Sequence, residues 1–231
     1  MSTPPSSPDE VKLPERHPGQ QAQRYLQKSR SGLARKLSHW REEQLARYSL
    51  NSAGEPGLVL DLPCRAGRFW PVLAEHGNRV ILAADDSPEV IQVAETLCAP
   101  EVLKRITTFQ ASVFSISLNS SAVDCIFCMR LFHHVESYEQ RRNILREFHR
   151  VSRDTVIISL WVDGNFKSWR RKRLEQRRLA AGQAVRRHNR FVVGKEQIER
   201  EFHDAGFEIV TYHDLIPGYA MWRTYVLRKP N

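Results

Sequence analysis

Short apolar runs alternate with stretches of helical spacing along most of this chain. One run, at residues 58–60, ends at Asp61, and a second, at residues 80–84, ends at the acidic pair Asp85 and Asp86. Between them lie a turn containing proline and glycine and a stretch in which apolar residues recur at helical spacing. Short buried strands joined by a helix form a βαβ unit with parallel strands. The pattern therefore predicts the start of an α/β fold.

The same alternation continues to the end of the chain and predicts one α/β domain at residues 51–231. A helix opened by Gly67 is expected after the first strand, and another, with Ser87 as its N-cap, is expected after the second. Further strands are expected at residues 106–111, 123–129, 155–161, 207–213 and 221–227, and further helices at residues 138–151 and 196–205.

The N-terminal segment differs in composition from the rest. Residues 1–20 are rich in proline and serine and hold few apolar groups, so burial cannot offset the entropy of ordering them, and we expect a disordered tail. Residues 21–50 are rich in helix formers and are expected to form a helical cap. Its apolar residues near helical spacing are Leu33, Leu37, Trp40, Leu45 and Tyr48. Within this pattern Trp40 is interpreted as a core anchor of the helix.

Composition narrows the cellular setting and the partners. No apolar stretch is long enough to span a membrane, and the first residues lack the apolar segment of a signal peptide, so we expect a cytoplasmic protein with free thiols. Cys125 and Cys128 share a predicted buried strand, where their side chains point to opposite faces, and no second Cys/His pair accompanies them. No metal site is therefore predicted.

The net charge of +9 favours anionic partners, namely nucleic acid, phosphorylated small molecules or an acidic membrane surface.

The turn after the first strand is the candidate binding site. In a βαβ unit this turn lies over the carboxyl ends of parallel strands, where backbone N–H groups and a helix N-terminus face a ligand. Asp85, which closes the second strand, stands at the spacing from which a carboxylate accepts hydrogen bonds from a ribose. These features predict a nucleoside-containing ligand and leave open whether it is NAD or S-adenosylmethionine.

Three motifs follow one another in the order VLDLPCRAGRFWPVLAE, ILAADDSPEVIQVAE and VDCIFCMRLFHHV, within residues 57–164. They resemble the class I S-adenosylmethionine-dependent methyltransferases, in particular the group that includes the ubiquinone and menaquinone C-methyltransferases. The resemblance implies a doubly wound, seven-stranded Rossmann-like sheet with an antiparallel last strand and an N-terminal helical cap. It also implies S-adenosyl-L-methionine as cofactor and methyl transfer as the activity. In this family the cap often packs over the cofactor as a lid, a role open to Tyr25 and Trp40.

The resemblance also assigns the cofactor site residue by residue. Asp61 corresponds to the residue that approaches the methionine portion of the cofactor, and Asp85 to the residue that binds the ribose. Ser112 holds the place of an acidic residue that meets the adenine amino group, where a hydroxyl accepts the same hydrogen bond more weakly. The full expected set is Asp61, Pro63, Cys64, Arg65, Gly67, Asp85, Asp86, Ser112, Val113, Met129 and Arg130.

His133 and His134 are the candidate catalytic residues. They follow the fourth strand, where the resembling enzymes bring cofactor and acceptor together, and histidine can act as a general base near neutral pH. The alternative is that they only cap or pack. Many methyltransferases need no base, because positioning the nucleophile against the sulfonium supplies most of the effect.

One departure from the family's Asp-x-Gly-x-Gly-x-Gly turn concerns the cofactor directly. Two of its glycine positions carry Pro63 and Arg65. Proline fixes φ and removes a donor, which a loop accommodates, whereas a non-glycine residue at positive φ costs on the order of 1 kcal/mol. Two alternatives stay open: Arg65 pairs with the carboxylate of the cofactor, or its side chain occupies the methionine pocket and weakens binding.

A basic insert at residues 166–190 lies close to the expected acceptor position. Its arginines interleave with Phe166 and Trp169 and could contact nucleic-acid phosphates, lie on an anionic membrane, or form a solvated helix. The sequence therefore favours a methyltransferase for an anionic or amphipathic small molecule. An RNA methyltransferase and a weakly active or inactive binding protein with the same fold are the alternatives.

Overall fold

The chain folds around a mixed sheet. The computed structural model describes residues 33–182 and 190–230, and within them the strand order is β3-β2-β1-β4-β5-β7-β6. The strands from β3 to β5 are parallel, and β7 runs antiparallel to both β5 and β6. The predicted seven-stranded arrangement with an antiparallel last strand is thus confirmed. The strands are β1 (Leu58–Asp61), β2 (Val80–Asp85), β3 (Ile106–Gln110), β4 (Val123–Cys128), β5 (Ser152–Trp161), β6 (Glu208–Asp214) and β7 (Trp222–Arg228).

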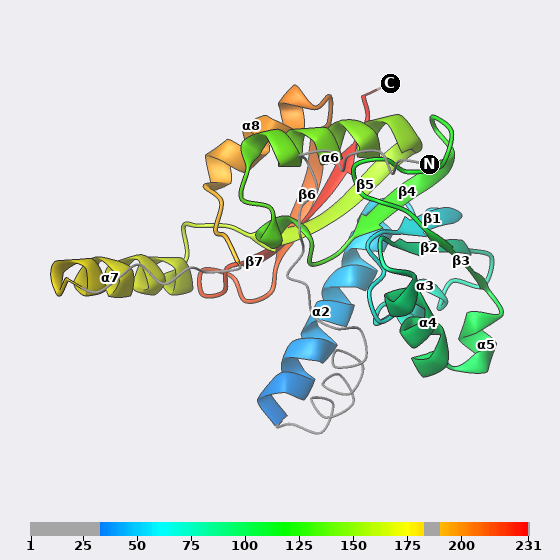
Figure 1. The fold of residues 1–231 in the computed structure, drawn as a ribbon, viewed down its shortest axis with the longest axis horizontal. Coiled ribbons are helices and arrows are strands. Elements are labelled where there is room, and N and C mark those ends of the chain that lie inside the picture. The colour runs from blue at the N-terminus through cyan, green and yellow to red at the C-terminus, as the bar shows by residue number, and fades with distance from the viewer. Residues whose placement is uncertain (1–32, 183–189, 231) are drawn as a thin grey trace, which may run out of the picture.

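Helices cover both faces of this sheet. The helices are α2 (Leu33–Ser52), α3 (Trp70–Leu73), α4 (Pro88–Leu97), α5 (Pro100–Leu103), α6 (Tyr138–Val151), α7 (Phe166–Ala180) and α8 (Lys195–Asp204), with a 3-10 helix, η1 (Phe132–His134). Figure 1 shows α6 and α8 on one face and α2, α3 and α4 on the other. Each face has its own cluster of buried apolar side chains. None of the described helices is long and apolar enough to cross a membrane.

The period of two along β4 separates its cysteines as expected. Cys125 packs in the cluster under α3 and α4, and Cys128 packs in the cluster under α6 and α8. Both are free thiols. Among the described residues, no group of three or more histidine, cysteine, aspartate or glutamate side chains could hold a metal ion.

Helix α6 follows directly from its sequence. Its bounds agree with the prediction, and Ser137 caps it by accepting a hydrogen bond from Gln140 N. One face buries Ile144 and Phe148 against the sheet. At its first turns Arg141 forms a buried, bidentate ion pair with Glu201 of α8, with both N–O distances at 2.7 Å.

The predicted apolar face of α2 is buried only in part: Leu45 is buried, but the prediction for Trp40 is wrong. Trp40, interpreted as a core anchor, is 54% exposed, and Leu37 and Tyr48 are also exposed. The helix packs against β6, β7 and α3 through Leu45, Leu50 and other residues of its C-terminal half, while its N-terminal half extends away from the sheet (Figure 1). Residues 21–32, including Tyr25, and the expected tail at residues 1–20 lie outside the described residues.

The helix after β1 also begins later than predicted. Gly67 has a φ of +63°, and hydrogen-bonded turns run from Cys64 to Trp70, where α3 begins. The indole of Trp70 lies against Gly67 so closely that an added Cβ would come within 2.7 Å of the ring. Glycine is therefore required here both for the backbone conformation and for the packing of Trp70.

Candidate functional site

The candidate site lies where the order of the strands reverses. β1 pairs with β2 on one side and with β4 on the other, so the chain leaves β1 and returns on both of its flanks. At such a switch point the loops after the strands diverge and leave space for a ligand. Asp61 ends β1, Asp85 ends β2, and Met129 and Arg130 follow β4. The fold thus gathers the principal residues predicted from the sequence at one edge of the sheet.

Asp85 is the carboxylate at the centre of this edge. It is 5% exposed, and its two oxygens accept hydrogen bonds from Arg65 N at 2.9 Å and from Ser87 N at 3.4 Å. Burial, followed by the neighbouring Asp86, raises the pKa of Asp85 to about 7. A carboxylate held at a strand end by backbone donors retains lone pairs for the hydroxyls of a ligand.

Arg65 adopts the strained conformation that its position in the turn demands. Its φ is +52°, in the left-handed region, which costs a non-glycine residue about 1 kcal/mol. Its side chain crosses to the end of β4, where Nη2 donates to the carbonyl oxygen of Arg130 at 2.8 Å. Burial lowers the pKa of the Arg65 guanidinium, and Nε is buried without a hydrogen-bond partner in the part of the chain that the structure describes. A cationic group thus spans the gap between the turn after β1 and the loop after β4.

Asp61 faces the interior of the turn. It is 2% exposed and accepts a hydrogen bond from Trp70 Nε1 at 3.1 Å. Burial raises the pKa of Asp61 well above its ordinary value, and the nearby charge of Asp85 adds to the rise. Cys64 is buried beside it, and its backbone N–H bonds to Ala84 O at 2.8 Å, which ties the turn to β2.

The other expected cofactor residues surround this core. Pro63 and Met129 are buried, and Asp86 is exposed. Ser112 lies in the loop after β3, where it is half-buried. Its hydroxyl accepts a hydrogen bond from Phe114 N at 3.3 Å. Val113 packs against the core below α6.

The two histidines differ in their surroundings. His133 is 3% exposed, and its ring centroid lies 4.1 Å from that of His134. Its Nδ1 is buried and finds no hydrogen-bond partner within residues 33–182 and 190–230. It stacks on Trp161 and meets Trp222 edge to face, with centroids 5.4 Å and 4.7 Å away. Burial, together with His134 and nearby arginines, lowers the pKa of His133 to about 2. His134 is half-buried.

Sequence reasoning missed Glu42, which reaches the site from α2. Glu42 pairs with Arg68 at 2.9 Å and with Arg130 at 3.3 Å, joining the helical cap to both flanks of the site. No local pattern marks Glu42, because it and Arg130 are 88 positions apart in the chain. Arg190, which ends the predicted basic insert, lies with its guanidinium carbon 5.4 Å from the ring centroid of Trp161.

Residues 59–155 match the family model of a methyltransferase domain. The chain has the methyltransferase fold. Among solved structures, it is similar to the magnesium protoporphyrin IX methyltransferase ChlM from Synechocystis PCC 6803 with bound SAH, at a TM-score of 0.72 and 17% identity over 93% of this chain and 95% of that one.

Two further structures with the methyltransferase fold are similar. A putative sarcosine dimethylglycine methyltransferase from Galdieria sulphuraria has a TM-score of 0.62 and 15% identity over 82% of this chain and 86% of that one. Human N-acetylserotonin methyltransferase in complex with SAM has a TM-score of 0.60 and 17% identity over 83% of this chain and 52% of that one. No curated protein matches the sequence significantly. The narrower resemblance to the ubiquinone and menaquinone enzymes stays a prediction.

Proposed function

We propose that this protein is an S-adenosylmethionine-dependent methyltransferase that acts on an anionic or amphipathic small molecule in the cytoplasm. The observation that carries the proposal is Asp85, a buried carboxylate fixed by two backbone donors where the strand order reverses. The methyltransferase-domain match at residues 59–155 and the fold support it. The four cysteines, all free thiols, agree with a reducing compartment.

The residues at this edge fit the cofactor. Asp85 would accept hydrogen bonds from the ribose hydroxyls, and Ser112 would accept one from the adenine amino group. When bound, the cofactor supplies an electrophilic methyl group on sulfur. The buried Nε of Arg65, which has no hydrogen-bond partner among the described residues, is a donor available to an anionic group such as the amino-acid carboxylate.

Arg65 decides how well the site binds. Its bond to Arg130 O holds the guanidinium between the turn and the end of β4, where the methionine portion would lie. We propose that the side chain shifts and pairs with the carboxylate of the cofactor, a charge-assisted bond that replaces a neutral one. The alternative, a weakly active or inactive protein, corresponds to a guanidinium that stays in place.

Basic side chains support an anionic acceptor. Arg130 lies over Trp222, and Arg171 and Arg190 lie over Trp161, with guanidinium carbons 5.4–5.8 Å from the ring centroids. Cationic groups held beside aromatic rings favour an acceptor that carries a carboxylate or phosphate next to an apolar body. Arg130 follows β4, the strand beside β1, and Trp161 ends β5, the next strand, so this basic and aromatic cluster lies on the β4 side of the proposed methyl group.

We assign the proposed general-base role to His134 in preference to His133. With a pKa of about 2, His133 would gain a proton only at a large cost, because its site is buried and surrounded by cations. Half-buried His134 can be hydrated when charged. His133 would instead orient Trp161 and Trp222, on which its ring packs.

Calorimetric titration with S-adenosylmethionine tests the proposal. The wild-type protein is expected to bind, and Asp85→Ala is expected to weaken binding by about 1–3 kcal/mol, the usual loss for a hydrogen bond to a charged group. Glu89→Ala, on an exposed carboxylate of the adjacent helix α4, is the matched control and should leave the affinity unchanged. Equal affinity in wild type and Asp85→Ala would remove the ribose assignment.

Arg65→Gly separates the two interpretations of the turn. If the guanidinium pairs with the cofactor, the variant binds more weakly than wild type. If the guanidinium blocks the pocket, wild type does not bind and Arg65→Gly does. The second result would favour the degenerate, non-catalytic alternative.

A further inference from the structure

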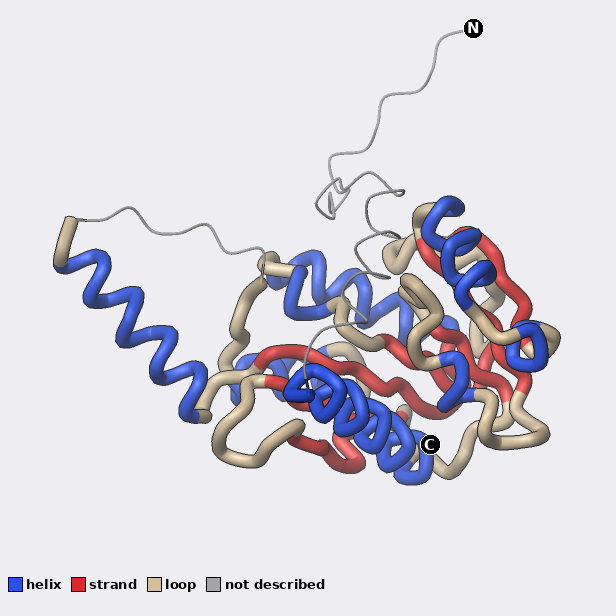
Figure 2. The backbone as a smooth tube through the Cα atoms, turned by 90° about the horizontal axis from the view of Figure 1, so that it is seen from below, coloured by secondary structure: helices blue, strands red, loops and turns tan. Residues whose placement is uncertain are grey.

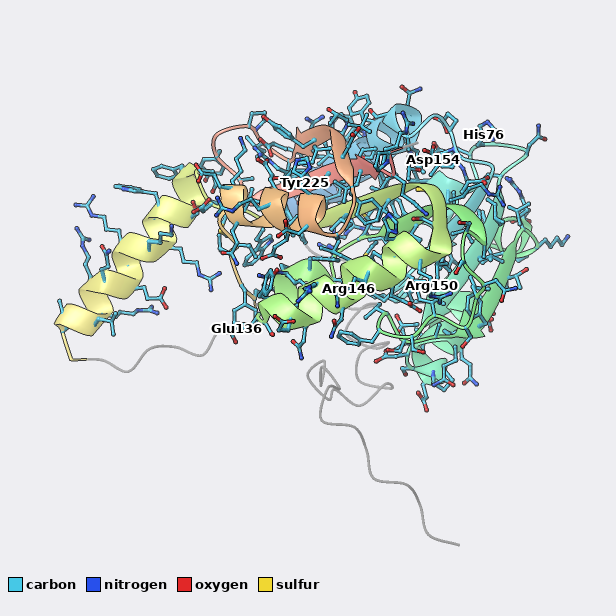
Figure 3. The ribbon with its side chains drawn as sticks, turned by 90° about the horizontal axis from the view of Figure 1, so that it is seen from above. His76, Glu136, Arg146, Arg150, Asp154 and Tyr225 are labelled. Atoms are coloured by element: carbon cyan, nitrogen blue, oxygen red, sulfur yellow. The ribbon has the colours of Figure 1, made fainter. Side chains whose placement is uncertain are left out.

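Helix α7 projects from the body of the protein as a basic arm. All three views show it extending beyond the other elements (Figures 1, 2 and 3). Its fifteen residues, Phe166–Ala180, hold seven basic side chains and one acidic side chain. It is anchored at its first turns, where Phe166 N and Lys167 N donate to the carbonyls of Gly218 and Tyr219 and Arg171 donates to Arg190 O.

The outer part of the arm has no partner in the described chain. Residues 173–180 make no hydrogen bond, ion pair or ring contact with another described element, and all but Glu175 are exposed. Arg173 and Arg177 stand one turn apart, as do Lys167 and Arg171, so like charges repel along the helix. A bound polyanion would offset this repulsion. It would thereby stabilise α7, because a fifteen-residue helix is only marginally stable alone in water.

The distribution of side chains around α7 favours nucleic acid. At 100° per residue, Arg170, Lys172 and Arg178 point in three different directions, and Leu174 and Leu179 lie on different sides as well. A helix that lies in a membrane interface needs one continuous apolar face, which α7 lacks. Five of its seven basic residues are arginines, whose planar group binds phosphate oxygens in pairs.

The root of the arm offers surfaces on which bases could stack. Phe166, Trp169 and Tyr219 are 48%, 53% and 43% exposed, and Phe166 lies between the other two with ring centroids 5.8 Å and 5.7 Å away. An open pocket of about 500 Å³ adjoins them, lined in part by Lys172. Aromatic faces beside a basic track are the elements with which proteins bind single-stranded nucleic acid.

We propose that α7 and the rings at its root bind a single strand of RNA. Helix α7 is about 22 Å long, which is the length of six or seven phosphates spaced about 3.4 Å apart along one strand. One side of the helix can contact about half of these phosphates. This surface does not depend on the proposed methyl transfer, and it can be tested without the cofactor.

Fluorescence anisotropy with a labelled single-stranded RNA, over a series of salt concentrations, tests the proposal. Wild type is expected to bind with a slope of log affinity against log salt of about −2 to −3, since each neutralised phosphate contributes about −0.7. The triple variant Arg170→Gln, Arg173→Gln, Arg177→Gln should bind at least about tenfold more weakly at about 0.1 M salt, with a flatter slope. Trp169→Leu should bind several-fold more weakly with the slope unchanged, because it removes stacking and no charge.

A second triple variant controls for total charge. Lys104→Gln, Arg146→Gln, Arg200→Gln removes three exposed cations from the body, of which Arg146 lies on α6 (Figure 3), and should bind RNA as wild type does. Equal losses in the two triple variants, or no RNA binding by wild type, would overturn the proposal. The proposal would also be overturned if the protein binds no RNA but floats with phosphatidylserine vesicles, and if this flotation is lost in the α7 triple variant. Circular dichroism melts of each variant verify that the fold is retained.

Discussion

Asp85 links the chemistry of the site to the stability of the protein. Its folded-state pKa of about 7 lies above the ordinary value of 3.8 because the carboxyl group is buried and adjoins Asp86. The folded state therefore favours the protonated form. The contribution of Asp85 to the unfolding free energy is therefore fully present below pH 3.8 and is lost as the pH rises to about 7.

Replacing this carboxyl group by an amide should remove that pH dependence. Asp85→Asn stays neutral, so its unfolding free energy relative to wild type is expected to rise from about pH 4 to pH 7 and then level. The full difference is about 4 kcal/mol, since the pKa rises from 3.8 to about 7 and one pKa unit corresponds to about 1.4 kcal/mol. Urea denaturation at several pH values measures it. A difference between the two proteins that does not change with pH would contradict the account.

At the scale of residues, the sequence predicted which side chains stand at the strand ends better than it predicted the contacts that those side chains make. The acidic ends of β1 and β2 could be located because strand periodicity and turn residues are local. The contact of Arg65 with Arg130 O and the enclosure of His133 by Trp161 and Trp222 could not be predicted, since they join residues that are distant in the chain. The positive φ of Arg65 was foreseeable from its place in a glycine turn.

At the scale of elements, the buried pair of Arg141 and Glu201 joins α6 to α8 and holds the loop that carries η1. The guanidinium also donates to Val135 O at 3.1 Å and to Glu136 O at 2.7 Å. Both side chains of the pair are 3% exposed, so either charge would be uncompensated without the other.

Removing one partner of this pair should therefore destabilise the protein strongly. Arg141→Met is expected to lower the unfolding free energy by about 3–5 kcal/mol, because it leaves the buried carboxylate of Glu201 without its compensating cation. Arg142→Met, on the exposed side of the same helix, should cost less than about 1 kcal/mol. The double variant Arg141→Met, Glu201→Leu should recover most of the loss. Chemical denaturation measures all three, and a double variant no more stable than Arg141→Met would contradict this explanation.

The elements also show which sequence patterns are informative. Helix α6 was predicted with its bounds from its apolar residues at helical spacing, and the cap and acidic first turn that the structure shows agree with that pattern. Helix α2 was predicted as a helix, but of its predicted apolar face Leu45 is buried and Trp40 is not. Only the C-terminal half of α2 meets the sheet, and periodicity does not show where the packing partner of a helix ends. The late start of α3 reflects the packing of Trp70 on Gly67, a contact that the glycine pattern does not contain.

For the molecule as a whole, the alternation of strands and helices predicted an α/β fold, because parallel βαβ units follow few topological rules. The seven-stranded sheet with its antiparallel last strand was implied by the family resemblance that the order of the motifs carries. The acceptor is not predicted by the same means, since this fold hosts many chemistries. The feature of this chain that bears on the acceptor is its positive charge, with arginines at the mouth of the proposed site and along α7.

The central claim is that a nucleoside sulfonium binds where β1 meets its turn, with its sugar on the carboxylate that ends β2. A crystal structure of the protein soaked with S-adenosylhomocysteine tests it most directly. We predict ribose hydroxyls within hydrogen-bond distance of Asp85 and the guanidinium of Arg65 turned from Arg130 O toward the carboxylate of the ligand. Density that shows Arg65 still bound to Arg130 O, with no ligand at Asp85, would contradict the account.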